Sequence, residues 1–172
     1  QQLQGEGLVV ILPNKGATVR LIDDQLIRHI YEIGEGLDGI LANRCAMVAT
    51  PPQVQQLKDI EKRMEDAAAA GDSVARANFN GEFHMQLGTI SGNTEAMDIR
   101  RRHQNLIRTI RQKFGYSPAR INEIHVEHWA IIDAIAARDV AAAEYAARIH
   151  CSRSCDDMLL RYRGFPPESA TA

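Results

Sequence analysis

The chain has 172 residues, which is enough for one medium-sized domain with a substantial buried core. Its composition, 45% hydrophobic and 24% charged, is that of an ordinary globular protein, and its net charge of −2 provides no broad attraction for nucleic acid or anionic membrane. There is no apolar run near the roughly 20 residues of a membrane span, no secretory signal and no disulfide framework among the three cysteines, so we expect a cytoplasmic protein that does not enter a membrane.

The first 22 residues differ from the rest and predict a β-hairpin. Two short β-branched runs, residues 8–12 and 17–21, are separated by the turn-forming sequence Pro-Asn-Lys-Gly at 13–16. A two-stranded hairpin alone is only marginally stable, so we expect this one to belong to a larger unit. Residues 1–6 look like the end of a helix, and we therefore expect the chain to begin within a domain.

From residue 24 onward the pattern is helical, with clear start and stop signals. Thr50 and Ser117 each precede a proline, a combination that opens helices. Gly71 ends one helix just before the capping residue Asp72, and Ser91-Gly92-Asn93 breaks the chain before the next helix. The expected helices cover residues 24–48, 51–70, 72–91, 93–114, 117–137 and 139–163. We therefore predict an all-α fold, an antiparallel bundle of about six helices over residues 23–163, preceded by the hairpin segment 1–22 and followed by a frayed tail, 164–172.

The third predicted helix carries a polar pair on an otherwise apolar face. Asn80 and His84 are four residues apart, so they lie on one side of the helix, beside Phe83 and Leu87. Burying an amide and an imidazole costs free energy unless both find partners. We therefore expect these two side chains to meet polar groups from other helices.

Two later helices each place one histidine among apolar residues. His128 interrupts an isoleucine stripe in the fifth helix, and His150 shares a face with Ala143 and Ala147 in the sixth. A single inward histidine is usually a core residue bonded to a neighbouring carbonyl or carboxylate. Three of them on three helices, with an amide one turn away, are also the ligands expected for a divalent ion such as Zn, Ni or Mn.

The other histidines and the cysteines do not share this arrangement. We expect His29, His103 and His125 to be solvated. Cys151 and Cys155 are four apart beside His150, which makes a thiolate metal site conceivable, but isolated cysteines more commonly pack as small apolar residues.

Three segments of the chain together resemble a known family of regulators. The sequence GLVVILPNKGATV, residues 7–19, resembles the wing of a GntR-type winged helix. The sequence NGEFHMQLGTISGN, residues 80–93, resembles the signature of the FCD effector domain of the FadR subgroup. The sequence ARINEIHVEHWAIIDAIAARDVAAAEYAARIH, residues 119–150, resembles a later part of that domain. Their order and spacing make the resemblance rather specific.

This resemblance implies a metabolite-responsive transcriptional regulator whose helical domain forms homodimers. In that family the domain binds a divalent metal through an acidic or amide residue and three histidines. Carried over, these ligands are Asn80, His84, His128 and His150. The implied effector is a small, usually carboxylate, metabolite that completes the coordination of the metal. Two departures stand out: Gly34 replaces an arginine that relatives usually carry, and Asp38 replaces a glutamate.

The resemblance also assigns residues 1–22 to the C-terminal remnant, the wing, of a winged helix-turn-helix domain. Asn14, Lys15 and Gly16 correspond to the wing tip, which in the family approaches DNA, although the same residues also suit an ordinary hairpin turn. The recognition helix would lie upstream of Gln1. We therefore expect the full-length protein to bind operator DNA, and residues 1–172 alone not to bind it specifically.

Two other functions compete with this interpretation. A helical metalloenzyme could use the three histidines and an open coordination position to activate water for hydrolysis or hydration. The only evident general bases are Glu82, which should face away from His84, and Glu127, which should point away from its neighbour His128, so we do not expect an enzyme. The second alternative is a structural bundle whose histidines are satisfied without metal.

Overall fold

The computed structural model describes residues 9–12 and 16–164. β1 (Val9–Leu12) and β2 (Gly16–Val19) pair antiparallel, with Val9 opposite Val19 and Leu12 opposite Gly16. Gly16 has a φ of 77°, in the left-handed region that glycine enters without steric cost. The expected helix end at 1–6, the turn residues Asn14 and Lys15, and the tail beyond residue 164 lie outside the described residues.

Six helices follow, and they confirm the all-helical prediction. Their ends agree with the predicted boundaries to within about two residues, as is usual for helix assignments. They are α2 (Asp24–Val48), α3 (Pro51–Ala69), α4 (Ser73–Ser91), α5 (Thr94–Phe114), α6 (Pro118–Ala136) and α7 (Val140–Arg163).

Capping side chains next to the helix starts explain why the sequence predicted the helix boundaries. Asp72, Asn93, Ser117 and Asp139 each accept a hydrogen bond from the backbone N–H three residues further on. Each bond satisfies one of the amides that the first turn of a helix leaves without an intrahelical partner. The sequence signals at these positions are therefore physical caps.

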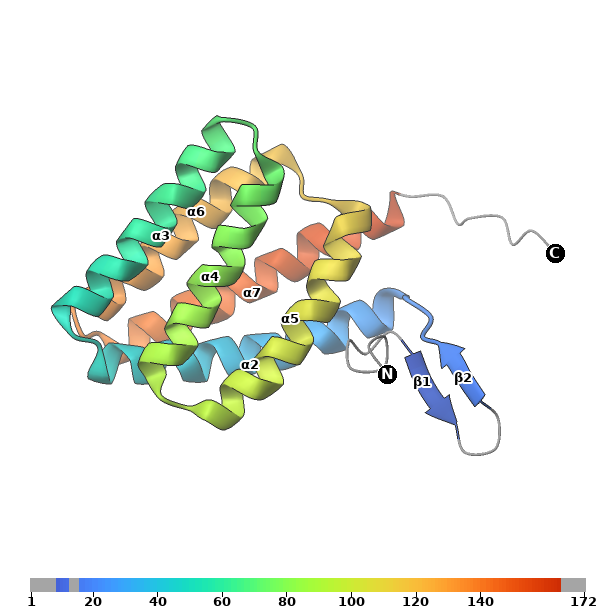
Figure 1. Cartoon of the computed structure of the whole chain (residues 1–172), viewed down its shortest axis with the longest axis horizontal. Helices are drawn as coiled ribbons and strands as arrows, with labels where there is room; N and C mark the ends of the chain where they lie inside the picture. The colour runs from blue at the N-terminus through green and yellow to red at the C-terminus, as the bar shows by residue number, and fades with distance from the viewer. Residues whose placement is uncertain (1–8, 13–15, 165–172) are drawn as a thin grey trace.

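The helices pack as an antiparallel bundle around a long central pair (Figure 1). α2 lies along α7, and α6 packs against both of them. α3 contacts both α4 and α6. α5 contacts α2, α4 and α7, so its residues approach the bundle at one end.

Hydrogen bonds tie the start of α2 to the end of α7. The Tyr162 hydroxyl donates to the Ile22 carbonyl at 2.9 Å, and Arg163 Nε donates to Asp24 at 2.7 Å. Ile22 is the last residue of the hairpin segment and directly precedes Asp23, the cap of α2. The last helix of the bundle is therefore fastened to the place where the hairpin joins it.

Arg138 closes the opposite end of the same helix pair. It follows α6 with a φ of 56°, a left-handed conformation that residues with a side chain rarely adopt. Its guanidinium donates to the Met47 and Ala49 carbonyls at 2.9 and 3.2 Å. These carbonyls lie at the C-terminal end of α2, where carbonyls lack intrahelical partners. The left-handed backbone at Arg138 therefore positions its guanidinium to hydrogen-bond them.

Two apolar clusters form the core, and a polar layer lies between them. On α7, Ala147 belongs to the first cluster and Cys151 to the second, with His150 between them. On α2, Asp38 lies between Tyr31 of the second cluster and the first-cluster residues that begin at Ala42. The first cluster includes Ala42, Cys45, Leu57, Ile60, Phe83, Leu87, Ile131, Ile132 and Ile135, and the second includes Leu26, Ile27, Ile30, Leu106, Ile110, Phe114 and Met158.

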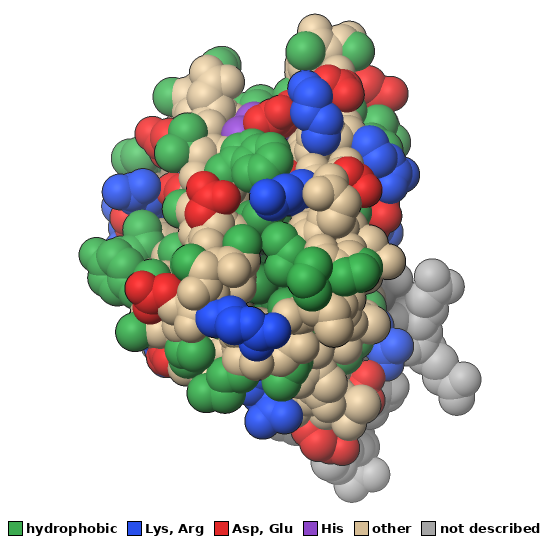
Figure 2. Space-filling view, turned by 90° about the vertical axis from the view of Figure 1, so that its left-hand side faces the viewer, with side chains coloured by type: hydrophobic (Ala, Val, Ile, Leu, Met, Phe, Trp, Pro, Cys, Tyr) green, Lys and Arg blue, Asp and Glu red, His purple; other side chains and the backbone are tan. Residues whose placement is uncertain are grey.

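The outer face at the end where α2 leads into α3 is chemically mixed. Figure 2 shows acidic and basic side chains interspersed there with apolar ones, without one sign of charge dominating that face. Among the described residues, no helix is both long and apolar enough to cross a membrane.

Candidate metal centre and effector cavity

The polar layer brings together three histidines from three helices. His84 of α4, His128 of α6 and His150 of α7 are all buried. One ligand nitrogen of each ring lies within 4.8 Å of the others. In a tetrahedral zinc site the ligand nitrogens are roughly 3.4 Å apart, so the rings would hold one ion after moving closer by about 1 Å.

Glu61 of α3 fixes the ring of His128. The His128 Nδ1 nitrogen donates to Glu61 Oε2 at 2.6 Å, and the His125 Nδ1 nitrogen donates to the other oxygen at 2.6 Å. The His128 ring also stacks on Phe83, with centroids 4.0 Å apart. This leaves the buried Nε2 of His128 without a hydrogen-bond partner among the described residues, as expected of a nitrogen held for an ion.

Glu127 fixes His150 in the same way. The His150 Nδ1 nitrogen donates to Glu127 Oε2 at 2.8 Å. Arg120 donates to both oxygens of Glu127, at 2.7 and 2.5 Å, and Arg153 adds a bond of 3.1 Å. The Nε2 nitrogen of His150 is thus the one that remains for a ligand. Two histidines of the cluster therefore each donate a hydrogen bond to a buried carboxylate.

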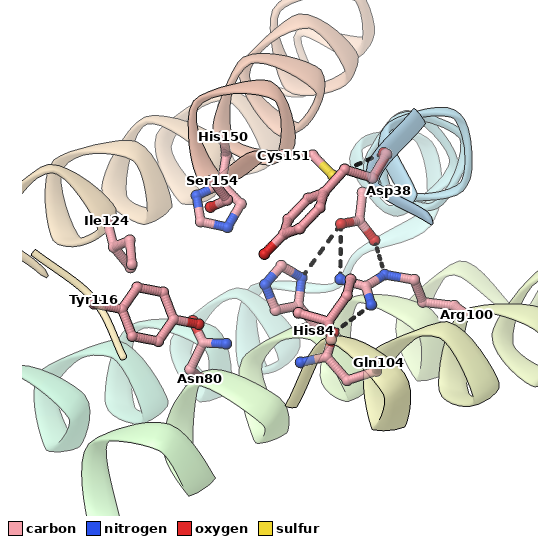
Figure 3. Close-up of a pocket in the computed structure, with 12 residues that line it drawn as sticks. Asp38, Asn80, His84, Arg100, Gln104, Tyr116, Ile124, His150, Cys151 and Ser154 are labelled. Atoms are coloured by element: carbon pink, nitrogen blue, oxygen red, sulfur yellow. Dashed lines mark hydrogen bonds and ion pairs between the residues drawn. The ribbon is translucent and has the colours of Figure 1, made fainter. Parts of the chain in front are cut away.

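His84 is held differently. Its Nδ1 nitrogen is buried without a hydrogen bond to any described residue, and the nearest carboxylate oxygen, Asp38 Oδ2, is 3.8 Å away. Asp38 is engaged by Arg100, which bonds both of its oxygens, one of them at 2.9 Å, and also bonds Gln104. Figure 3 shows this chain of polar groups beside the His84 ring.

Burial sets the protonation of these groups. It lowers the pKa of His150 to about 4, although Glu127 opposes the shift. Burial, reinforced by Arg100 and the neighbouring imidazoles, holds the pKa of His84 well below its usual range. Burial alone would raise the pKa of Glu127, but hydrogen bonds from His150 and Arg120 lower it to about 2. At neutral pH, His84 and His150 are therefore uncharged, which is the form that binds metal.

Asn80 lies one helical turn before His84 and faces the same space. It lines a cavity of about 30 Å³ together with His84 and His150, and Figure 3 shows these side chains pointing toward it. The Asn80 amide forms no hydrogen bond to another described residue. Of the predicted ligands, the structure thus clusters the three histidines and places Asn80 on the wall of the adjoining cavity. Of the predicted wing-tip residues it describes only Gly16, in the hairpin.

A second, larger hollow adjoins this cavity. It is a cleft of about 830 Å³ between α4 and α5. Asn80, Gln104, Ile107 and Tyr116 line both the cleft and the inner cavity. The histidine cluster is therefore buried but adjoins a space of the size that small ligands occupy.

The residues that hydrogen-bond the histidines were not predicted from the sequence. The prediction that His125 is solvated was wrong, because its side chain is only 13% exposed and bonds Glu61. Glu127 directly precedes His128 on α6, but it accepts a hydrogen bond from His150 of α7, a contact that was not predicted. The sequence gives no signal for Glu61, which lies far from His128 along the chain. Cys45 and Cys151 pack in the apolar clusters, as expected of cysteines outside a metal site.

An all-helical bundle with a buried polar cluster beside a cleft defines a small-ligand-binding domain. The sequence matches the FCD domain family over residues 29–153, and the chain belongs to that family, the effector domain of the FadR subgroup of GntR-type regulators. A relative from Agrobacterium vitis, an uncharacterized HTH-type transcriptional regulator in the TAR-I ttuE-ttuC' intergenic region, is 35% identical over 89 residues. The match spans 50% of this chain and 52% of that protein.

Solved structures show the same fold at low sequence identity. Escherichia coli McbR/YncC superposes with a TM-score of 0.79 at 14% identity, over 95% of this chain and 81% of that one. Streptococcus agalactiae GntR superposes with a TM-score of 0.64 at 21% identity, over 90% of this chain and 77% of that one. These similarities establish the fold of the chain.

Proposed function

We propose that this chain is the effector-binding part of a metabolite-responsive transcriptional regulator. In this proposal His84, His128, His150 and Asn80 hold a divalent ion, such as Zn, Ni or Mn, and a small organic acid completes its coordination. The observation that carries the proposal is the cluster of three buried histidines, two of them fixed by buried carboxylates. Outer carboxylates of this kind orient metal-binding imidazoles.

The charges that line the cleft favour an acid as effector. Four arginines line the cleft that adjoins the cavity, and no aspartate or glutamate is among the described residues around it. A three-histidine site leaves coordination positions open for an oxygen ligand. An anionic metabolite would thus be attracted into the cleft and could reach the ion.

The hairpin connects this site to DNA in the proposed mechanism. Residues 1–22 would be the wing end of a winged-helix domain, with Asn14, Lys15 and Gly16 at its tip. Effector and metal would favour one arrangement of the bundle and thereby change how the DNA-binding domains are held. In the full-length protein, the acid should change operator affinity. An operator affinity that is unchanged at saturating acid would contradict this mechanism.

Metal analysis tests the site directly. We expect about one divalent ion per chain after purification with Zn or Ni supplied, as a single three-histidine site predicts. His128→Ala should lose the ion, since its ring is fully buried in the cluster. His29→Ala, which changes an exposed histidine of α2, is the matched control and should keep it. Retention of the ion by His128→Ala, or no ion in the unchanged protein, would refute the metal site.

The enzyme alternative has less support. A hydrolytic mechanism needs a general base near the metal, but Glu61 and Glu127 are both committed to histidines. The low pKa of Glu127, about 2, also makes it a weak base at neutral pH. Glu82 is exposed and pairs with Arg63. Metal-dependent turnover of simple esters by the purified chain would favour the enzyme over the regulator.

A further inference from the structure

Arg76, in the first turn of α4, is a buried cation without a counter-ion. Its side chain belongs to a residue only 6% exposed, yet it forms no hydrogen bond or ion pair with another residue that the structure describes. Its guanidinium lies over the ring of Tyr116, 4.7 Å from the centroid. A charge without an opposite charge nearby is costly to hold in a largely buried residue, and the adjoining cleft is the space from which a partner could come.

The other buried arginines in the described part of the chain are all paired. Arg100 binds Asp38, Arg111 binds Asp157 and Arg120 binds Glu127. The fold thus supplies a carboxylate wherever it buries a guanidinium, except at Arg76. This contrast indicates that the partner of Arg76 lies outside the described residues, and the cleft beside it has room for a bound anion.

The surroundings of Arg76 suit an anion. Arg76 lines the cleft between α4 and α5, as do Arg101, Arg108 and Arg111, and no acidic side chain of the described residues faces that space. Arg101 is exposed and paired with Asp98, and Arg111 with Asp157, so Arg76 is the buried cation of the cleft that is free to bind. A guanidinium on the wall of a cleft binds an anion more strongly than one on the open surface, because the surrounding protein lowers the local dielectric.

Tyr116 connects this position to the histidine cluster. Its ring stacks against the guanidinium groups of Arg76 and Arg111, and it lines both the cleft and the inner cavity. Asn80 also lines both spaces. A ligand with one end at the histidines would pass Asn80 and Tyr116, and its other end would enter the cleft that contains Arg76.

We propose that Arg76 binds a second anionic group of the effector, which makes the effector a small acid with two anionic groups. The second group is a carboxylate or a phosphate, since a guanidinium binds either in the same two-pronged manner. The inference rests on the proposed function for the first group, which binds at the metal. It adds a specificity-determining residue that selects dianionic over monoanionic acids.

Calorimetric titration of the whole, zinc-loaded chain tests the proposal. The probes are pairs of equal carbon number, butyrate with succinate and pentanoate with glutarate, together with 3-phosphoglycerate as the phosphate probe. A bond from a charged donor to an anion corresponds to roughly tenfold or more in affinity. We therefore expect at least one dianion to bind about tenfold more tightly than the monoacids.

Substitutions then locate the effect. Arg76→Gln should abolish the preference for the dianion while leaving monoacid affinity and zinc content unchanged. Arg76→Lys should restore part of it. Arg101→Gln, which removes an exposed arginine from the same cleft, is the matched control and should keep the preference. The melting temperature of Arg76→Gln should not fall, because the substitution removes an uncompensated buried charge.

Each possible result is decisive. Tightest binding of 3-phosphoglycerate, lost in Arg76→Gln, identifies a phosphate, and tightest binding of a dicarboxylate, lost likewise, identifies a carboxylate. Equal binding of mono- and dianions, or an unchanged preference in Arg76→Gln, overturns the inference but leaves the metal-bound carboxylate standing. If no acid binds the zinc-loaded chain, the carboxylate effector of the proposed function fails as well. A preference that depends on Arg76 but persists after chelation of zinc supports the subsite and separates it from the metal.

Discussion

Glu61 and Glu127 decide which nitrogen of two histidines is offered to a ligand. By accepting from Nδ1 of His128 and His150, they leave Nε2 of both rings toward the centre of the cluster. Glu61 is fully buried and holds His125 as well, so its position depends on two bonds rather than one. The carboxylates therefore preset the geometry of the site.

Replacement of Glu61 should weaken metal binding without removing a ligand. Glu61→Gln keeps the size of the side chain but removes its charge. The His128 ring is then oriented less strongly, and its Nε2 nitrogen is a less basic ligand for the metal. We expect metal affinity to fall by about 10–100-fold, measured by competition with a chelator of known affinity. Glu82→Gln, at an exposed position of α4, should leave affinity unchanged. Equal affinity in Glu61→Gln and the unchanged protein would contradict this role.

At this scale the sequence predicts ligands better than it predicts their supports. Inward positions of His84, His128 and His150 follow from helical spacing and apolar neighbours on the same helix. The partnership of Glu61 with His128 depends on how α3 and α6 approach one another, which local pattern does not encode. For the same reason the buried role of His125 was not predicted.

Individual helices follow their sequence signals closely because their ends are capped by their own neighbours. Ser117 and Asp139, for example, bond the backbone three residues on, and each lies where the sequence predicted a start. Glycines inside helices, in contrast, lower the stability of the helices that the sequence predicts. Gly36 lies within α2 and costs stability through backbone entropy.

Gly36→Ala should stabilise the protein. No atom outside its own helix lies within 4 Å of the position that a Cβ would occupy, so the substitution meets no clash. We expect a gain of about 1 kcal/mol in the free energy of unfolding, seen as a rise of roughly 2–4 °C in melting temperature. Gly71→Ala is the counterpart: it has equal space but a φ of 71°, so it should destabilise. A lower melting temperature for Gly36→Ala would refute the expectation.

The exposed side of α2 supports the proposed homodimer. Ile33, Ile40 and Met47 are 47%, 44% and 54% exposed and recur every seventh residue, so they form one apolar stripe on the helix. Ile40→Glu should shift the protein from dimer to monomer in light scattering, because a charge would be buried in the interface. Val126→Glu, at an exposed apolar residue of α6, should leave the mass unchanged. A dimer that tolerates Ile40→Glu would place the interface elsewhere.

For the molecule as a whole, the polar layer between two apolar clusters explains why a metal site can be buried here. The clusters on either side supply the packing, so the layer between them can hold the bonded pair of Asp38 and Arg100 with the His84 ring beside it. The sequence predicted the bundle and the inward histidines. The division of the core into two clusters emerged only from the packing of α2 against α7.

The bond from Tyr162 to Ile22 gives α7 a mechanical role. His150 and Tyr162 lie on the same unbroken helix, about 18 Å apart along its axis. We expect a small displacement of His150 to be transmitted along this helix to Ile22 through the Tyr162 hydrogen bond. Metal binding should therefore slow hydrogen exchange at residues 22–24 of the unchanged protein. In Tyr162→Phe the bundle should bind metal and acid as before, but metal should no longer slow hydrogen exchange at residues 22–24. Equal slowing in both proteins would mean that motion reaches the hairpin by another route.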